Sequence, residues 1–91
     1  MIYKAKDLTL NTDTYEVYYK NKEVHLSLTE FNILHCLLIN KGHYVGRRNI
    51  EMNVLKSIDK SNLIDVYINY IRNKTSYNLI KTIRSIGYII K

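Results

Sequence analysis

The first part of the chain alternates apolar and polar residues in short segments rich in β-branched and aromatic side chains. Residues 15–19 (YEVYY) and 23–26 (EVHL) flank a polar turn centred on Asn21, a residue type suited to tight turns. Residues 7–10 form an earlier candidate strand, and the polar residues 11–13 follow it. The pattern predicts a small antiparallel sheet with one apolar face.

From residue 28 onward the apolar residues recur at helical spacing, which predicts a first helix. Ser27 and Glu30 form an S-x-x-E capping box at its start, and Gly42 stands where a C-cap is wanted. The residues expected on its apolar stripe are Leu28, Phe31, Leu34, Leu37 and Leu38, with Ile33 and Ile39 widening the stripe.

Two further helices are predicted after this one. A short helix over residues 48–56 places Ile50, Val54 and Leu55 on one side, and residues 57–60 form a connector. A third helix starts with Ser61 or Asn62 as N-cap and runs to about residue 74. Its predicted core side consists of Ile64, Tyr67, Ile68 and Ile71, and its opposite side consists of Val66, Asn69, Tyr70 and Asn73.

The tail of the chain is typical of a closing hairpin, with residues 79–84 and 88–91 as its strands and residues 85–87 as the turn. Strands, three helices and a hairpin follow one another within 91 residues, enough for one domain over residues 1–91. This order predicts an α+β fold. It is a winged helix-turn-helix with an N-terminal antiparallel sheet, three helices and a C-terminal β-hairpin wing.

The net charge of the chain indicates which class of partner it is suited to bind. Fourteen Lys and Arg residues against eight acidic residues give a formal net charge of +6, which favours a polyanion, nucleic acid before an acidic membrane surface. A single cysteine suits a reducing cytoplasm and argues against a disulfide framework. The sequence shows no nucleophile–base pair, metal-ligand spacing or phosphate-cradling glycine loop, so we expect no enzyme and no cofactor.

Four motifs then occur in order along the chain: LSLTEFNIL at residues 26–34, GHYVGR at 42–47, NLIDVYI with IRNK at 62–68 and 71–74, and TIRSIGY at 82–88. With them the chain resembles the C-terminal effector domain of OmpR/PhoB-type response regulators over essentially its whole length. The resemblance implies transcriptional regulation as the output domain of a two-component system, through sequence-specific binding to double-stranded promoter DNA.

The same resemblance implies how the domain would bind. The third helix enters the major groove, the wing arginine enters the adjacent minor groove, and two chains bind direct repeats as a head-to-tail dimer. It also implies contact with RNA polymerase and with the protein's own receiver domain. That receiver is absent from these 91 residues, which we interpret as an isolated effector domain or a natural stand-alone version.

The chain departs from the family pattern at several positions, among them Leu55, where relatives often have an aromatic residue, and a short connector over residues 57–61. Asn69 and Tyr70 stand where relatives commonly carry arginines, which favours a different, A·T-rich target because asparagine pairs with adenine. Ser85 replaces a frequent wing glycine, which leaves Gly87 to adopt any positive φ. The lost arginines keep open an alternative function, a protein-interaction winged helix that contacts RNA polymerase or a receiver and reads little or no DNA.

Candidate contacts to DNA fall into three groups, each of which could instead be ordinary solvated surface. Valine methyls pack on thymine methyls, asparagines pair with adenine, and cations contact phosphates or a narrow minor groove. The candidates are Arg47, Arg48, Asn62, Val66, Asn69, Tyr70, Asn73, Lys74, Thr82 and Arg84, with Lys81 as a further candidate phosphate ligand. Asp65 is expected to have a structural role near a helix N-terminus, where it could hold an arginine in place. His25, His35, Cys36 and His43 lack ligand spacing and are expected to pack.

Overall fold

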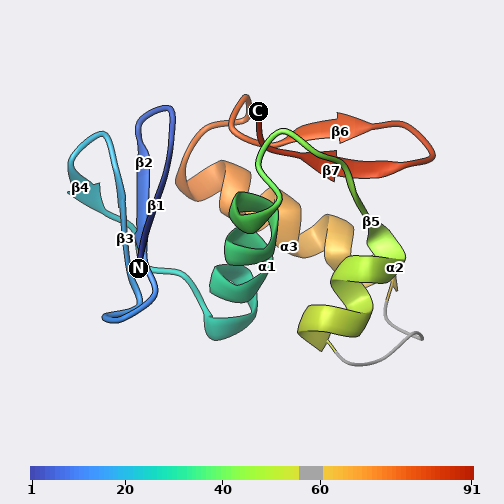
Figure 1. Cartoon of the computed structure of the whole chain (residues 1–91), viewed down its shortest axis with the longest axis horizontal. Helices are drawn as coiled ribbons and strands as arrows, with labels where there is room; N and C mark the ends of the chain where they lie inside the picture. Colours follow the sequence, from blue (N-terminus) through green and yellow to red (C-terminus); the bar gives the residue numbers. More distant parts are fainter. Residues whose placement is uncertain (56–60) are drawn as a thin grey trace.

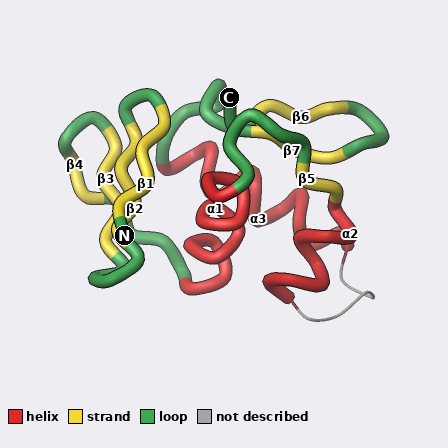
Figure 2. The backbone as a smooth tube through the Cα atoms, viewed as in Figure 1, coloured by secondary structure: helices red, strands yellow, loops and turns green. Residues whose placement is uncertain are grey.

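The computed structural model describes residues 1–55 and 61–91. A four-stranded sheet lies at one end of the long axis, the helices follow it, and a three-stranded sheet that contains the wing lies toward the other end (Figures 1 and 2). This is the α+β winged helix-turn-helix predicted from the order of the elements. No helix within the described ranges combines the length and apolar character that a membrane crossing demands.

The N-terminal sheet is an antiparallel meander of β1 (Ile2–Ala5), β2 (Leu8–Asn11), β3 (Glu16–Tyr19) and β4 (Lys22–Glu23). Its inner face buries Ala5, Leu8, Leu10 and Val17, which confirms the predicted apolar face. β4 begins and ends earlier than the predicted strand at 23–26, because Lys20 and Asn21 both adopt positive φ and form a tight two-residue turn.

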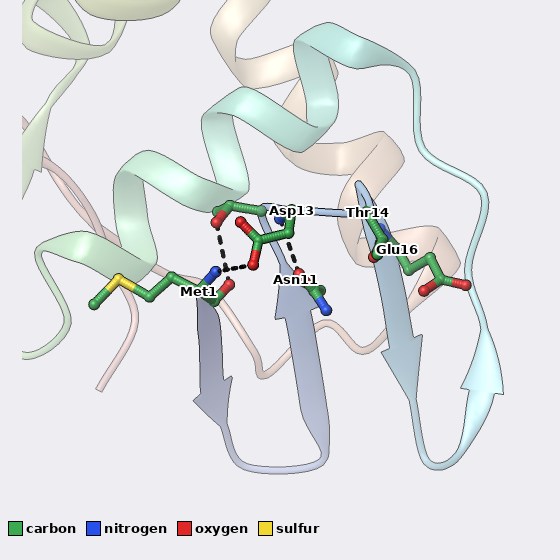
Figure 3. Close-up of polar contacts among 6 residues, drawn as sticks. Met1, Asn11, Asp13, Thr14 and Glu16 are labelled. Carbon is green, nitrogen blue, oxygen red and sulfur yellow. Dashed lines mark hydrogen bonds and ion pairs between the residues drawn. The ribbon is translucent and has the colours of Figure 1, made fainter.

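Polar contacts close one end of this sheet, where β1 starts and β2 ends (Figure 3). The amino group of Met1 lies 2.9 Å from Asp13 Oδ2, and the amide of Asp13 donates to Asn11 Oδ1 at 2.9 Å. Thr14 Oγ1 accepts from the amide of Glu16 at 3.4 Å. Residues 12–15 form the turn between β2 and β3, and these bonds hold its polar groups.

The first helix, α1 (Leu28–Ile39), has both hydrogen bonds of the predicted capping box, between Ser27 and Glu30. Six of its residues are buried: Glu30, Phe31, Ile33, Leu34, Leu37 and Leu38. The prediction was wrong for Leu28 and Ile39, which are exposed at the two ends of the helix where the apolar stripe leaves the core.

The prediction of Gly42 as the C-cap was also wrong. The helix ends at Ile39 with Asn40 as C-cap, and Asn40 is held by bonds from its backbone and its side chain to the carbonyl of Cys36. Gly42 lies two residues further on with φ +87° and donates to the carbonyl of Ile90 at 2.7 Å. The glycine therefore turns the chain toward the C-terminal strand.

The second helical segment joins one α-helical turn, α2 (Arg47–Ile50), to a π-helical turn, η1 (Glu51–Leu55). It starts one residue before the predicted range, and Ile50 is fully buried as predicted. The predicted end at residue 56 and the connector at 57–60 lie outside the described residues. The third helix, α3 (Ser61–Lys74), ends where it was predicted to end.

The C-terminal sheet contains the predicted hairpin with shorter strands, β6 (Lys81–Ile83) and β7 (Gly87–Ile89), and its turn lies at residues 84–86, one residue before the predicted turn. The sheet also contains one strand that the sequence pattern did not reveal, β5 (Val45–Gly46). β7 lies between β5 and β6. Ser85 adopts φ +65° in the turn, so Gly87 is not left alone to take a positive φ. Gly87 has φ +155°, and a Cβ there would lie 2.1 Å from the carbonyl oxygen of Val45.

Candidate nucleic-acid interface

The outward side of α3 is an accessible surface. Ile64, Ile68 and Ile71 are fully buried against the core, which turns the opposite side of the helix to solvent. Four predicted site residues are exposed together on that side, and we call them the α3 face: Val66, Asn69, Tyr70 and Asn73. The helical spacing that predicted this group is therefore confirmed, and the structure brings its members together.

The wing presents a second accessible surface. Thr82 lies on β6 and is exposed, and Arg84 is exposed in the turn between β6 and β7. The hairpin extends outward at the far end from the N-terminal sheet (Figure 1). A guanidinium on so thin a ribbon is suited to a narrow minor groove, where the negative potential is enhanced.

Asp65 joins α3 to the wing and to α2. Its Oδ1 accepts from Arg47 Nε at 3.1 Å and also accepts a hydrogen bond from the Tyr88 hydroxyl. The Arg47 guanidinium lies 5.2 Å from the centre of the Tyr88 ring, within range of a cation–π interaction. The expected structural role of Asp65 is confirmed. Arg47 is half-buried in this cluster.

Arg72 makes the second link between α3 and the wing. Its Nε and Nη2 donate to the carbonyl of Ile80 at 3.2 and 2.7 Å, and Nη2 also donates to Thr82 Oγ1 at 2.7 Å. Its guanidinium stacks 4.8 Å from the centre of the Tyr77 ring. Arg72 was not among the residues predicted from the sequence to contact DNA. The sequence contained one signal for Arg72: it follows Asp65 by seven residues, about two helical turns, so both side chains lie on the same side of α3.

Lys74 is paired within the protein. Its Nζ lies 2.8 Å from Oε1 of Glu30, whose side chain is buried and also caps α1. Lys74 was predicted as a phosphate contact, and any such contact competes with this ion pair. The interaction instead connects the C-terminal end of α3 to the N-terminal end of α1.

The remaining candidates differ in their surroundings. Arg48 is exposed on α2, one residue after Arg47. Asn62 belongs to the first turn of α3, and its side chain lies outside the part of the chain that the structure describes.

His35 packs beside Tyr3 and Phe31, and burial, with a contribution from the charged N-terminus, lowers its pKa. Burial raises the pKa of the Cys36 thiol, which disfavours the reactive thiolate.

The exposed helix and wing define a DNA-binding winged-helix class of protein, and comparison with known proteins agrees. Residues 21–90 match the family described as "Transcriptional regulatory protein, C terminal". The chain belongs to this family, the DNA-binding output domains of OmpR/PhoB-type response regulators, which regulate transcription and are not enzymes. The family, fold and general function predicted from the sequence are confirmed.

Two curated relatives illustrate the similarity. The response regulator ArlR of Staphylococcus aureus is 33% identical over 96 residues, and the response regulator RR06 of Streptococcus pneumoniae is 30% identical over 92 residues. These alignments cover 99% and 98% of this chain. They span 44% of ArlR and 42% of RR06, so the chain corresponds to less than half the length of these relatives.

Solved structures show the same architecture. DrrB of Thermotoga maritima, an OmpR/PhoB homologue, has a TM-score of 0.90 at 28% identity and covers 99% of this chain, which spans 44% of DrrB. The DNA-binding domain of E. coli CpxR has a TM-score of 0.88 at 26% identity, with 99% and 95% of the two chains covered. The RstA domain of Klebsiella pneumoniae, solved in complex with the RstA box, has a TM-score of 0.87 at 25% identity, with 98% and 95% covered.

Proposed function

We propose that the chain binds double-stranded promoter DNA sequence-specifically, with the α3 face in the major groove and the wing turn in the adjacent minor groove. The observation that carries the proposal is that the α3 face and Arg84 are exposed while two sets of hydrogen bonds tie the wing to α3. Two reading elements held in a fixed relation can engage neighbouring grooves of one duplex. RstA, a relative of the same fold, was solved in complex with the RstA box, which supports the binding of DNA.

The proposed contacts divide by chemistry. Asn69 and Asn73 would hydrogen-bond base edges, with adenine as the preferred partner of an asparagine amide. Arg48 would contact phosphates and fix the register, and Arg84 would enter the minor groove. Arg47, Lys74 and Thr82 already have partners within the protein, and their DNA contacts are the weaker part of the proposal. Asn62 and Tyr70 remain candidates for contact with DNA.

The proposed partners extend beyond DNA. Direct repeats would recruit two chains in head-to-tail order. In a longer protein of the ArlR type, a receiver domain would control this binding, and RNA polymerase would be contacted from the bound state. This function places the chain in the cytoplasm, together with the DNA.

A second candidate function follows from the cations of α3. Arg72 and Lys74 are both engaged by protein groups, which favours a protein-interaction winged helix with weak DNA reading. Fluorescence titration of a mixed genomic duplex at two salt concentrations separates the candidates. A DNA-binding domain should lose affinity steeply as salt rises, because bound cations release counterions from the duplex. Little affinity for duplex at either salt concentration would contradict the proposed function.

A further inference from the structure

An apolar stripe lies along the outward side of α3. Leu63, Val66 and Tyr70 are 37%, 39% and 48% exposed. Their spacing of three and seven residues aligns them on one side of the helix, over about 10 Å of helix axis. The Tyr70 ring meets Tyr67 edge-on, with 6.3 Å between ring centres, and this contact restrains it. The stripe borders Asn69 and Asn73 of the α3 face.

This side of α3 offers no arginine or lysine for reading guanine. Arg72 and Lys74 are the two cationic residues between positions 61 and 74. Arg72 donates three hydrogen bonds to Ile80 and Thr82 of the wing segment. Lys74 pairs with the carboxylate of Glu30, and withdrawing it would leave a buried charge unpaired, which is costly. The common bidentate contact of a cation with guanine is therefore disfavoured on this helix.

We propose that the stripe of Leu63, Val66 and Tyr70 reads the 5-methyl groups of thymine in the major groove. Thymine is the base that presents an apolar group there, and the neighbouring asparagines match the adenine edge of the same base pairs. With base pairs about 3.4 Å apart, the stripe covers about three of them. The ligand class is duplex DNA with A·T pairs facing the stripe. This inference rests on the proposed function and names its specificity.

Duplex DNA is the occupant that the surroundings of the stripe favour. The stripe shares Val66 and Tyr70 with the α3 face and lies beside its polar residues Asn69 and Asn73, and the exposed wing arginine Arg84 belongs to the same proposed interface. The net charge of +6 attracts a polyanion to this domain. A protein partner could also cover an apolar stripe, but its binding would not depend on thymine methyl groups, so the comparison of thymine with uracil separates the two occupants.

The experiment compares thymine with uracil in one duplex. A binding site is first selected from a random duplex pool with the 91-residue chain, and the enriched duplex is remade with deoxyuridine in place of thymidine at single positions. Uracil keeps the base pairing and the minor-groove edge of thymine and lacks only the methyl group. Each methyl contacted by the stripe should contribute about fourfold in affinity, measured by fluorescence anisotropy at fixed salt.

A variant of the stripe locates the effect on the protein. Val66→Ala shortens the side chain at the centre of the stripe, so it should weaken binding to the thymine duplex and reduce the thymine-to-uracil ratio at its position toward one. The matched control is Ile39→Ala, which trims a residue 57% exposed on α1 outside the proposed interface and should keep the full ratio. Because Val66 is exposed, the melting temperature of Val66→Ala should stay at the wild-type value.

Three results would contradict the methyl-reading inference or the proposed function, and the experiment distinguishes them. Selected sites whose affinity is unchanged by uracil, or sites with G·C pairs opposite α3, would overturn the methyl-reading inference and leave the proposed function standing. A uracil effect that persists fully at every position in Val66→Ala would show that the stripe is not its source. No enriched site and no salt-dependent duplex binding would overturn the proposed function and the inference with it.

Discussion

Single residues in this domain divide into those that face the proposed ligand and those that hold the reading elements in place. Asn69 and Arg84 are exposed, and neither side chain has a hydrogen bond or ion pair to another described residue. Asp65 and Arg72 instead bond to the wing. Substitutions in the first group should change binding without changing stability, and substitutions in the second should change both.

The exposed group gives a prediction about the kind of contact. Arg84→Ala should weaken binding to all site variants by a similar factor and lower the salt slope by about one ion, because the minor groove shows a degenerate pattern. Asn69→Ala should instead remove about 1–3 kcal/mol of discrimination at one or two base pairs with little change in salt slope. Titration of both variants against single-base changes at several salt concentrations measures the difference.

Neither of these two variants should unfold the domain, and a thermal melt of each provides the control. If Asn69→Ala leaves every base preference unchanged, the α3 face does not read sequence through this residue. The protein-interaction function would then gain support.

Asp65 gives a prediction about the internal group. Its side chain is 49% exposed, so the ion pair with Arg47 contributes little. The hydroxyl of Tyr88, a residue 3% exposed, loses its acceptor in Asp65→Ala, and leaving a buried donor unpaired costs about 1–3 kcal/mol. Asp65→Asn keeps an acceptor oxygen and should lose less. Urea unfolding of both variants tests this order, and equal stability of Asp65→Ala and wild type would contradict it.

At the scale of elements, α1 is the centre of the core, between the N-terminal sheet and α3. Phe31→Ala should lower the free energy of unfolding by about 3–5 kcal/mol, because it empties a buried aromatic site. Leu28→Ala on the same helix is the matched control, since Leu28 is 63% exposed and should be nearly neutral. Chemical denaturation of both variants would show whether the assignment of the buried side is right. Similar midpoints for the two variants would refute it.

The three-stranded C-terminal sheet depends on the close approach of β5 and β7. Gly87→Ala would place a methyl carbon 2.1 Å from the Val45 carbonyl oxygen, so the strands must separate and the wing should lose its order. Gly42→Ala is the control, because Gly42 also has positive φ but has open space around its Cβ position. It should lose only the cost of placing an L-residue at positive φ, about 1–2 kcal/mol. Amide hydrogen exchange of β6 and β7 reports the difference, and unchanged protection in Gly87→Ala would contradict the prediction.

The elements that could be predicted from the sequence are those set by local pattern. The capping box of Ser27 and Glu30 and the helical spacing of Ile64, Ile68 and Ile71 depend on neighbours within a few turns. β5 could not be found, because two residues carry no period and the strand exists through pairing with β7. Gly42 was misplaced for a similar reason, since its hydrogen-bond partner is Ile90.

The proposed site could be predicted from the sequence to the same extent, where it depends on local pattern. The α3 face follows from helical spacing, so its exposed residues could be named in advance. The engagement of Lys74 by Glu30 joins residues 44 positions apart, and no local pattern records it. Arg72 was missed because its partners, Ile80 and Thr82, become neighbours only when the wing folds back along α3.

At the scale of the whole molecule, separate contacts link the two sheets through the helices. Lys6 Nζ, in the turn after β1, donates to the carbonyl of Asn78 at 3.1 Å, in the segment that leads to the wing. Lys74 ties α3 to the cap of α1. The N-terminal sheet, the helices and the wing therefore form one connected unit, and the relation of α3 to the wing is set before DNA is bound.

The net charge leads to the prediction on assembly. Each chain carries +6, so two copies repel each other in solution, and a duplex that neutralises them allows close approach. We expect the 91-residue chain to sediment as a monomer at micromolar concentration and to bind a direct repeat as two chains. Placing the two half-sites on opposite faces of the duplex, by half a helical turn of extra spacing, should abolish any cooperativity. A stable dimer without DNA at moderate salt would contradict this prediction, because the association would then come from a protein surface that overcomes the repulsion.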